Sequence, residues 1–295
     1  MIKKYQIKNL NKKQKIKLKR VVKEYNIIFS EWFLHYTVFL SKIVNPKKQK
    51  LFVRLHRCEI LKKFIFEANW KNITKVIFIN PYIENIVKSK IKASINKTCV
   101  IHNYINYPKI DEEILNNDET KFNICMVGYV PKLKRPDIAI NIYRELKKYD
   151  SKYNLYLIGK SINFVRKKPV EMEYYKTKII NQSDINILPY NSNLSNFYNK
   201  MGHILICSDV ESFHVSSHEA LSYGVYSYYV GNCLNYISNI IPNEFQFKNI
   251  DSVVNKIVEN NNNFSKEDNR KMYENYLEKY KLSKIAYNIF ELITK

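Results

Sequence analysis

The chain has 295 residues, 45% of them hydrophobic, which is enough for the buried cores of one large or two medium-sized domains. No apolar run approaches the roughly 20 residues of a membrane-spanning helix, and the start, Met1 to Tyr5, lacks the apolar core of an export signal. The five cysteines form no CxxC pair, which predicts reduced thiols of a cytoplasmic protein rather than a disulfide framework.

The formal net charge is +22. It has two explanations: an anionic partner, or the Lys-, Asn-, Ile- and Tyr-rich composition that AT-rich coding produces. Residues 3–23 stand out because Lys and Arg crowd there, and each is worth roughly 1 kcal/mol at an anionic membrane surface. A helix over 12–23 would have little apolar face, so we expect electrostatic, peripheral contact with the inner face of the cytoplasmic membrane. No signature of RNA or DNA binding is present, so nucleic acid is not expected as a partner.

Residues 26–102 alternate short apolar runs with amphipathic segments. Strands are expected at 26–30, 50–55, 75–79 and 98–101, and helices at 33–43, 59–68 and 81–93. This alternation predicts βαβ units and a parallel sheet. Residues 1–104 are therefore expected to form a short N-terminal Rossmann-like domain. A polar, acidic linker follows at 105–121 and includes Asp111, Glu112 and Glu113.

A second α/β series follows the linker. Strands are expected at 122–127, 153–158, 185–188, 203–207 and 225–230, and helices at 136–149, 195–201, 214–223, and in pieces near 250–260, 266–280 and 283–294. The asparagine tract at 260–263 is expected to be a loop. The fold class is therefore α/β, with a second Rossmann-like domain at 122–280. A last helix at 281–295 is expected to pack back on the N-terminal domain.

All five glycines lie between positions 128 and 231. Gly128, Gly159 and Gly231 each follow an expected strand, at the edge of an open α/β sheet where ligands bind. Glycine permits positive φ and close approach of the backbone to a ligand. We expect Gly128 to serve a ligand, whereas Gly202 and Gly224 are expected to be ordinary turn glycines.

The loop after Gly128 is basic and leads into a helix that starts at Pro136. Backbone N–H groups and the helix dipole favour an anion at such a place, and Lys134 and Arg135 add full charges beside it. The loop is neither a GxxxxGK[ST] phosphate loop nor a GxGxxG dinucleotide fingerprint. Taken alone it is a weak signal, because basic residues before a helix are often simply solvated.

Two acids, Glu211 and Glu219, lie in a strand–loop–helix stretch eight residues apart. A carboxylate can accept hydrogen bonds from two adjacent hydroxyls of a ribose or a sugar. If the helix begins near His214, its free N–H groups face a phosphate between the two acids. The pattern therefore predicts a site for a hydroxyl-rich ligand that carries phosphate. The alternative for Glu219 is a surface acid on a solvated helix.

Residues 211–219 resemble the Glu-x7-Glu motif of family 4 glycosyltransferases, which are retaining enzymes of GT-B fold. The loop at 127–139 looks like the loop that opens that family's donor domain, and 205–225 looks like its Ser…Glu-Gly-Phe-Gly…Glu-Ala run. Val100-Ile-His-Asn103 looks like its interdomain segment. The likeness spans about 26–290 and is strongest over 122–231. It implies two Rossmann-like domains whose parallel sheets face a cleft.

The resemblance implies catalytic roles for Glu211 at the transferred sugar, Lys134 at the diphosphate and His56 near the reacting carbon. For His56 the alternative is a histidine at a strand end with no role. Glu219 would hold the ribose hydroxyls, and the backbone of residues 213–215 would face the sugar and the diphosphate. The implied donor-binding residues are Gly128, Lys134, Arg135, Phe213, His214, Val215 and Glu219. No metal and no cofactor are expected.

Three departures from the family pattern stand out. Tyr129 replaces the family's loop arginine, Ser212 and His214 replace two glycines, and the first domain is short. The function expected is that of a retaining hexosyltransferase. It would move a sugar from a nucleotide-diphosphate sugar to a glycan or lipid-linked acceptor in cell-surface polysaccharide biosynthesis, such as lipopolysaccharide or capsule. The alternative is a non-catalytic glycosyltransferase-like partner protein.

Overall fold

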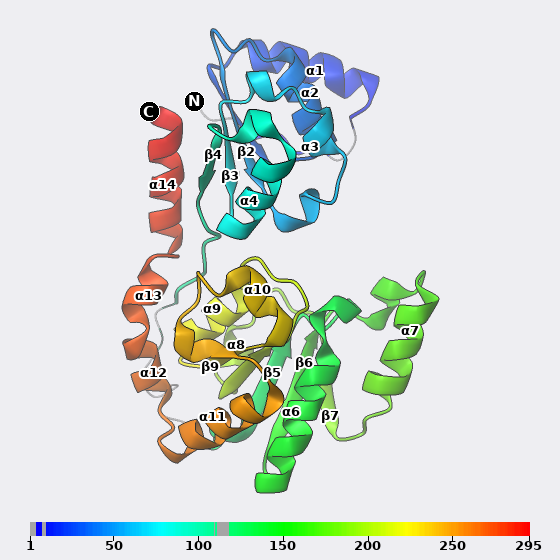
Figure 1. Ribbon diagram of the computed structural model, residues 1–295, viewed down its shortest axis with the longest axis vertical. Helices are drawn as coiled ribbons and strands as arrows, with labels where there is room; N and C mark the ends of the chain where they lie inside the picture. The colour runs from blue at the N-terminus through cyan, green and yellow to red at the C-terminus, as the bar shows by residue number, and fades with distance from the viewer. Residues whose placement is uncertain (1–3, 8–9, 109, 111–117) are drawn as a thin grey trace. The chain divides into compact units, whose positions relative to one another are not determined.

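The computed structural model describes residues 4–7, 10–108, 110 and 118–295 and divides into two compact units (Figure 1). The N-terminal unit comprises Met1–Asn103 and Ser283–Lys295, and the C-terminal unit comprises Tyr104–Leu282. Each unit contains its own parallel sheet, which confirms the predicted α/β class. Lys3 and Lys8 of the basic head and the acidic residues 111–113 lie outside the described residues.

The sheet of the N-terminal unit has the order β1-β2-β3-β4, with every pair parallel. Its strands are β1 (Ile27–Glu31), β2 (Lys50–Leu55), β3 (Lys75–Phe78) and β4 (Thr98–Val100). Its helices are α1 (Lys12–Lys23), α2 (His35–Ile43), α3 (Phe64–Glu67), α4 (Pro81–Lys90) and α14 (Leu282–Thr294). The central strands β2 and β3 are buried along most of their length, as is typical of a parallel sheet covered by helices. From α14, Ile285 packs against Ile77 and Ile101.

Helix α1 carries the basic residues at 12–23 on its exposed face. Asn11 caps it by accepting a hydrogen bond from the backbone N–H of Gln14 at 3.0 Å. Leu18 and Val22 are the buried residues of the helix, and Val22 joins the core of the unit. The lysines therefore remain available to solvent. Among the described residues, no helix combines the length and the hydropathy of a membrane span.

The helix predicted at 59–68 is wrong. The chain instead forms a 3₁₀ turn at Arg57–Glu59 and a separate short helix, α3. The Glu59 carboxylate is buried and accepts hydrogen bonds from the backbone N–H groups of Phe33 at 2.8 Å and His56 at 3.0 Å. These two bonds hold the 3₁₀ turn against the segments that follow β1 and β2.

The sheet of the C-terminal unit has the order β10-β9-β8-β5-β6-β7, again all parallel. Its strands are β5 (Asn123–Val127), β6 (Asn154–Gly159), β7 (Ile185–Pro189), β8 (His203–Ile206), β9 (Tyr226–Val230) and β10 (Gln246–Phe247). The chain builds outward from β5 to β7 and then returns to β8 on the other side of β5. The strand order therefore reverses between β5 and β8, and ligands of open α/β sheets bind at the carboxyl ends of strands at such a point.

Helices cover both faces of this sheet (Figure 1). One core lies under α6 (Pro136–Tyr149), α7 (Pro169–Tyr175) and α11 (Ile250–Asn262). The other face is covered by α8 (Ser195–Tyr198), α9 (Val215–Ser222), α10 (Leu234–Ile237) and α13 (Glu274–Glu278), and α12 (Lys266–Met272) packs against α9. The amphipathic stripe expected on 136–149 faces the first core, with Ile142, Tyr143 and Leu146 buried.

The loop predicted for the asparagine tract is wrong, because α11 continues to Asn262. Two of its asparagines find partners in the sheet. Asn260 donates to the hydroxyl of Tyr228 at 2.7 Å, and Asn261 donates to the hydroxyl of Tyr153 at 2.8 Å. These tertiary hydrogen bonds outweigh the weak helix propensity of asparagine.

Gly224, just after α9, should be among the least replaceable glycines of the chain. It has φ +74°, and a Cβ placed there would lie 2.2 Å from the carbonyl oxygen of Lys266. The Gly224→Ala variant is expected to lose about 2–5 kcal/mol of unfolding free energy, from left-handed backbone strain plus steric overlap.

Gly231 is the matched control, because it has the same φ but no heavy atom within 4 Å of the added Cβ. The Gly231→Ala variant should lose only the backbone term, about 1–2 kcal/mol. Denaturant unfolding of both variants measures the difference. Equal losses would show that the contact with Lys266 is unimportant.

Candidate functional site

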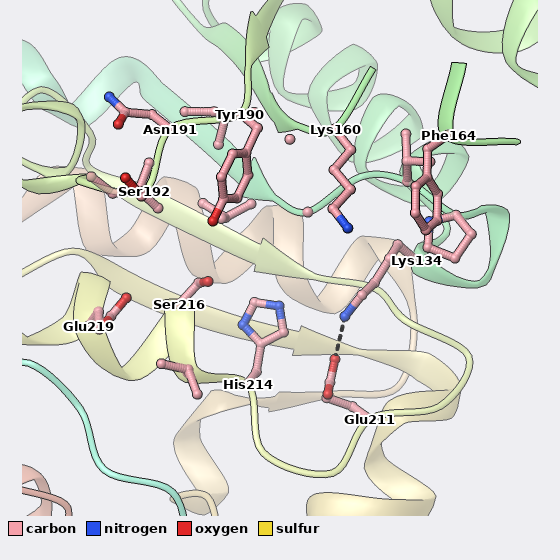
Figure 2. Close-up of a pocket in the computed structure, with 18 of the residues that line it drawn as sticks. Lys134, Lys160, Phe164, Tyr190, Asn191, Ser192, Glu211, His214, Ser216 and Glu219 are labelled. Carbon is pink, nitrogen blue, oxygen red and sulfur yellow. Dashed lines mark hydrogen bonds and ion pairs between the residues drawn. The ribbon is translucent and has the colours of Figure 1, made fainter. Parts of the chain in front are cut away.

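A cavity of about 500 Å³ lies at the carboxyl ends of the strands of the C-terminal unit (Figure 2). It is lined by residues that follow β5, β6 and β7 and by the N-terminal part of α9. This is the edge of the sheet at which β5 and β8 mark the reversal of strand order. Of the predicted site residues, those that line the cavity are Gly128, Lys134, Glu211, Phe213, His214, Val215 and Glu219.

An ion pair joins the basic loop to the acidic motif. Lys134 is the last residue of a 3₁₀ turn over Lys132–Lys134. Its Nζ lies 2.7 Å from Glu211 Oε2. Glu211 is only 7% exposed and also accepts a hydrogen bond from the backbone N–H of Ser212 at 3.0 Å. Burial alone would raise the pKa of Glu211, but the Lys134 ammonium outweighs it and lowers that pKa to about 2. Glu211 is therefore a carboxylate at neutral pH.

Glu219 lies in the same cavity, on α9. It is half-buried, and burial raises its pKa, partly offset by a hydrogen bond from the backbone of Asn106. No ion pair involving Glu219 occurs within the described ranges. The two acids therefore differ. The negative charge of Glu211 is balanced by the Lys134 ammonium, whereas Glu219 faces the cavity without a cationic partner among the described residues.

The N-terminus of α9 opens into the cavity between the two acids. The helix begins at Val215, and His214 is its N-cap: His214 Nδ1 accepts a hydrogen bond from the backbone N–H of Ser217 at 3.2 Å. Burial lowers the pKa of His214 to about 3, although nearby Glu211 opposes this, so the ring is neutral. Phe213 stacks on His218 with ring centroids 4.3 Å apart, which holds the preceding loop against the core.

Gly128 directly follows β5 and lines the cavity. It has φ +82°, and a Cβ there would meet no heavy atom within 4 Å. Open space beside an accessible backbone is what close approach of a ligand needs. The neighbouring Tyr129 is buried and packs edge-on against Tyr175, with ring centroids 6.2 Å apart. Its side chain therefore belongs to the core.

Arg135 is not among the residues that line the cavity. It forms ion pairs with Asp137 at 2.8 Å and Asp209 at 3.0 Å, and it adopts the left-handed conformation with φ 56° just before α6. The guanidinium therefore joins the start of α6 to the loop after β8. Binding of the donor diphosphate by Arg135 stays a prediction.

His56 belongs to the N-terminal unit, just after β2. Its Nε2 lies 2.9 Å from Glu31 Oε1, and its ring stacks on Trp32 with centroids 4.1 Å apart. Trp32 has φ 74°, which is uncommon for a bulky side chain. The three residues form a polar and aromatic group at the carboxyl ends of β1 and β2. A role for His56 at the donor sugar stays a prediction.

Several residues that line the cavity were not predicted from the sequence: Lys160, Phe164, Tyr190, Asn191, Ser192 and Ser216. Lys160 directly follows Gly159, so its place at a strand end was the available signal. Its Nζ lies 4.4 Å from the centroid of the Phe164 ring. The loop after β7 has no motif that would have marked it. Across the residues that the structure covers, no three His, Cys, Asp or Glu side chains gather as metal ligands, and the metal-free reaction stays a prediction.

The family model described as "Glycosyl transferases group 1" matches residues 108–275.

Among solved structures, TarM from S. aureus matches with a TM-score of 0.72 and 15% identity, over 95% of this chain but only 57% of TarM. Anabaena HepE, crystallised with UDP and glucose, matches with a TM-score of 0.73 and 15% identity, over 96% of this chain and 81% of HepE. A glycosyltransferase from Rickettsia africae matches with a TM-score of 0.68 and 15% identity, over 99% and 83% of the two chains. No match was found among curated proteins. The likeness to these structures confirms the predicted GT-B fold class.

Proposed function

Since the chain belongs to the group 1 glycosyl transferases, we propose that it transfers a sugar from a nucleotide-diphosphate sugar to a glycan or lipid-linked acceptor. The observation that carries the proposal is a single cavity that holds the Lys134–Glu211 pair, the N-terminus of α9 and Glu219. These groups suit the three parts of such a donor. Cations and a helix N-terminus suit the diphosphate, and carboxylates suit the hydroxyls of the sugar and the ribose.

The chemistry follows from where charge develops. As the bond between the sugar carbon and the diphosphate oxygen breaks, negative charge grows on the diphosphate and positive charge on the sugar ring. Lys134 and the N–H groups of α9 stabilise the negative charge on the diphosphate. The Glu211 carboxylate faces the positive charge on the sugar ring. We propose that the enzyme is a family 4 member that retains the configuration of the sugar, with front-face attack by the acceptor hydroxyl. His56 would lie near the reacting carbon.

The acceptor side is proposed from charge. The exposed lysines of α1 would hold the enzyme at an anionic membrane surface. A lipid-linked glycan of cell-surface polysaccharide, such as lipopolysaccharide or capsule, would then be the acceptor. A cytoplasmic, peripheral location is part of the same proposal.

A donor screen tests the function. The purified chain is incubated with UDP-, GDP- and ADP-hexoses, with and without EDTA, and release of the nucleoside diphosphate is measured. HepE was crystallised with UDP-glucose, which makes UDP-hexoses the first choice. We expect slow hydrolysis of one donor, unaffected by EDTA, and release of the sugar with retained configuration.

The same screen separates the second candidate function. The chain spans 57% of the length of TarM. The observation that favours a non-catalytic glycosyltransferase-like partner is Tyr129, which replaces the family's loop arginine and is buried in the core. Such a partner would bind a nucleotide and hydrolyse none of the donors. Failure to bind any nucleotide would contradict both candidates.

A further inference from the structure

His214 holds a polar group that is aimed into the cavity and left without a partner. The residue is only 7% exposed and lines the cavity. Its Nδ1 is used by the backbone N–H of Ser217, whereas Nε2 has no hydrogen-bond partner among the described residues. In Figure 2 the imidazole lies between Glu211 and Glu219, and the ends of Lys134 and Lys160 lie on the same side of the ring as Glu211. Nε2 therefore opens to the cavity, and a ligand that fills the cavity can serve as its partner.

The helix cap determines which ring nitrogen carries the proton. Because Nδ1 accepts the hydrogen bond from Ser217, its lone pair is occupied and it cannot carry a hydrogen. The ring is neutral, since burial opposes a charge on it. A neutral imidazole has one N–H. The proton is therefore on Nε2, and Nε2 is a hydrogen-bond donor directed at whatever fills the cavity.

The surroundings identify the acceptor as an anion. Lys134 and Lys160 line the cavity near His214, and the N-terminus of α9 adds the positive end of a helix dipole. The Lys160 ammonium forms no ion pair within the described chain. A hydrogen bond to a charged oxygen is roughly twice as strong as one to a neutral hydroxyl. The site therefore favours a phosphate oxygen over a sugar hydroxyl opposite Nε2.

We propose that the His214 Nε2–H donates to an oxygen of the diphosphate of the nucleotide-sugar donor. This rests on the proposed function and deepens it, because it makes a neutral side chain part of the diphosphate site. The nucleoside diphosphate would thus contact two lysines, the N-terminus of α9 and the Nε2–H of His214. The hydrogen bond between α9 and Nδ1 is what keeps the proton on Nε2. His214 is then a residue that recognises the diphosphate.

His214→Asn is the variant of choice. Asparagine is a good N-cap and replaces Nδ1 as acceptor for Ser217, but it is too short to carry a donor to the position of Nε2. Calorimetry with UDP, GDP and ADP first identifies the nucleotide that the unaltered protein binds. We expect the variant to bind that nucleoside diphosphate about tenfold more weakly. The affinity for the parent nucleoside, measured by ligand-observed NMR, should be unchanged.

Two further measurements exclude a structural explanation. His214→Gln returns an N–H near Nε2 and should recover part of the affinity, although it lacks the cap. Nitrogen NMR of the unaltered protein should show hydrogen on Nε2 and none on Nδ1, with the Nε2 signal shifting as the diphosphate is added.

Several outcomes would overturn the proposal: hydrogen on Nδ1, equal loss of nucleoside and diphosphate affinity, or loss confined to the intact nucleotide sugar. The last would place the donated bond on the sugar. If the unaltered protein binds none of the three nucleoside diphosphates, the proposed function itself fails. A His214→Asn variant that binds the nucleoside diphosphate as tightly as the unaltered protein would instead overturn only the role of His214.

Discussion

Replacing Lys134 with methionine is expected to lower kcat/KM for sugar transfer by about 10²–10³-fold. The reason is that Lys134 is the charged group nearest to Glu211 in the cavity and faces the place proposed for the departing diphosphate. Methionine retains most of the unbranched apolar stem of lysine and removes its charge. Steady-state release of the nucleoside diphosphate, measured against the donor found in the screen, gives the loss.

The same substitution leaves the Glu211 carboxylate buried without its cation. Because breaking a buried pair costs about 3–5 kcal/mol, the single variant should be less stable, and lower activity could reflect unfolding. The double variant Lys134→Met, Glu211→Gln removes both charges and should recover most of the unfolding free energy. Its transfer rate should stay low. A double variant with restored stability and restored transfer would contradict a role for the pair in the reaction.

Replacing Glu219 with alanine should weaken binding of the nucleoside diphosphate by about 10²-fold. Two ribose hydroxyls that donate to a carboxylate form charge-assisted bonds, each worth about 1.5–3 kcal/mol. Glu219 faces the cavity without a cationic partner in the described chain, so its charge is free to accept them. Calorimetry with the nucleoside diphosphate identified in the screen measures the effect.

A ligand lacking both ribose hydroxyls provides the matched control. The unaltered protein should bind the 2′,3′-dideoxynucleotide about as weakly as the Glu219→Ala variant binds the natural one, and the variant should not distinguish the two. Burial raises the pKa of Glu219, which means that its charge costs stability at neutral pH. The variant is therefore expected to remain folded. Discrimination between the two nucleotides by the variant would assign the ribose to another residue.

Much of the fold follows from local patterns in the chain. Apolar runs such as 50–55 and 153–158 form strands because their residues are buried on both faces of a parallel sheet. The joint position of Glu211 and Glu219 in one cavity was also predictable. A loop that leaves a strand end and turns directly into a helix keeps both acids at the same edge of the sheet. Because Glu211 and Glu219 are close in the sequence, no further helix or strand can separate them.

Other features depend on contacts between residues far apart in the chain. The Glu59 carboxylate holds a 3₁₀ turn through the backbone of Phe33, and Asn261 lies in an extended helix where its side chain donates to the Tyr153 hydroxyl. Arg135 pairs in the same way with Asp209, which is distant in the chain. No local pattern carries such information, because a hydrogen bond or ion pair depends on where the packed core brings its second partner.

The stretch from Glu211 to Glu219 shows both local patterns and distant contacts. The spacing of its acids, and Ser212 and His214 in place of the family's two glycines, are visible in the sequence. Which way that ring faces, and which nitrogen carries its hydrogen, depended on the packing of α9 against the sheet. That packing buries the imidazole and turns Nδ1 to the backbone N–H of Ser217, and Nε2 is left for the ligand.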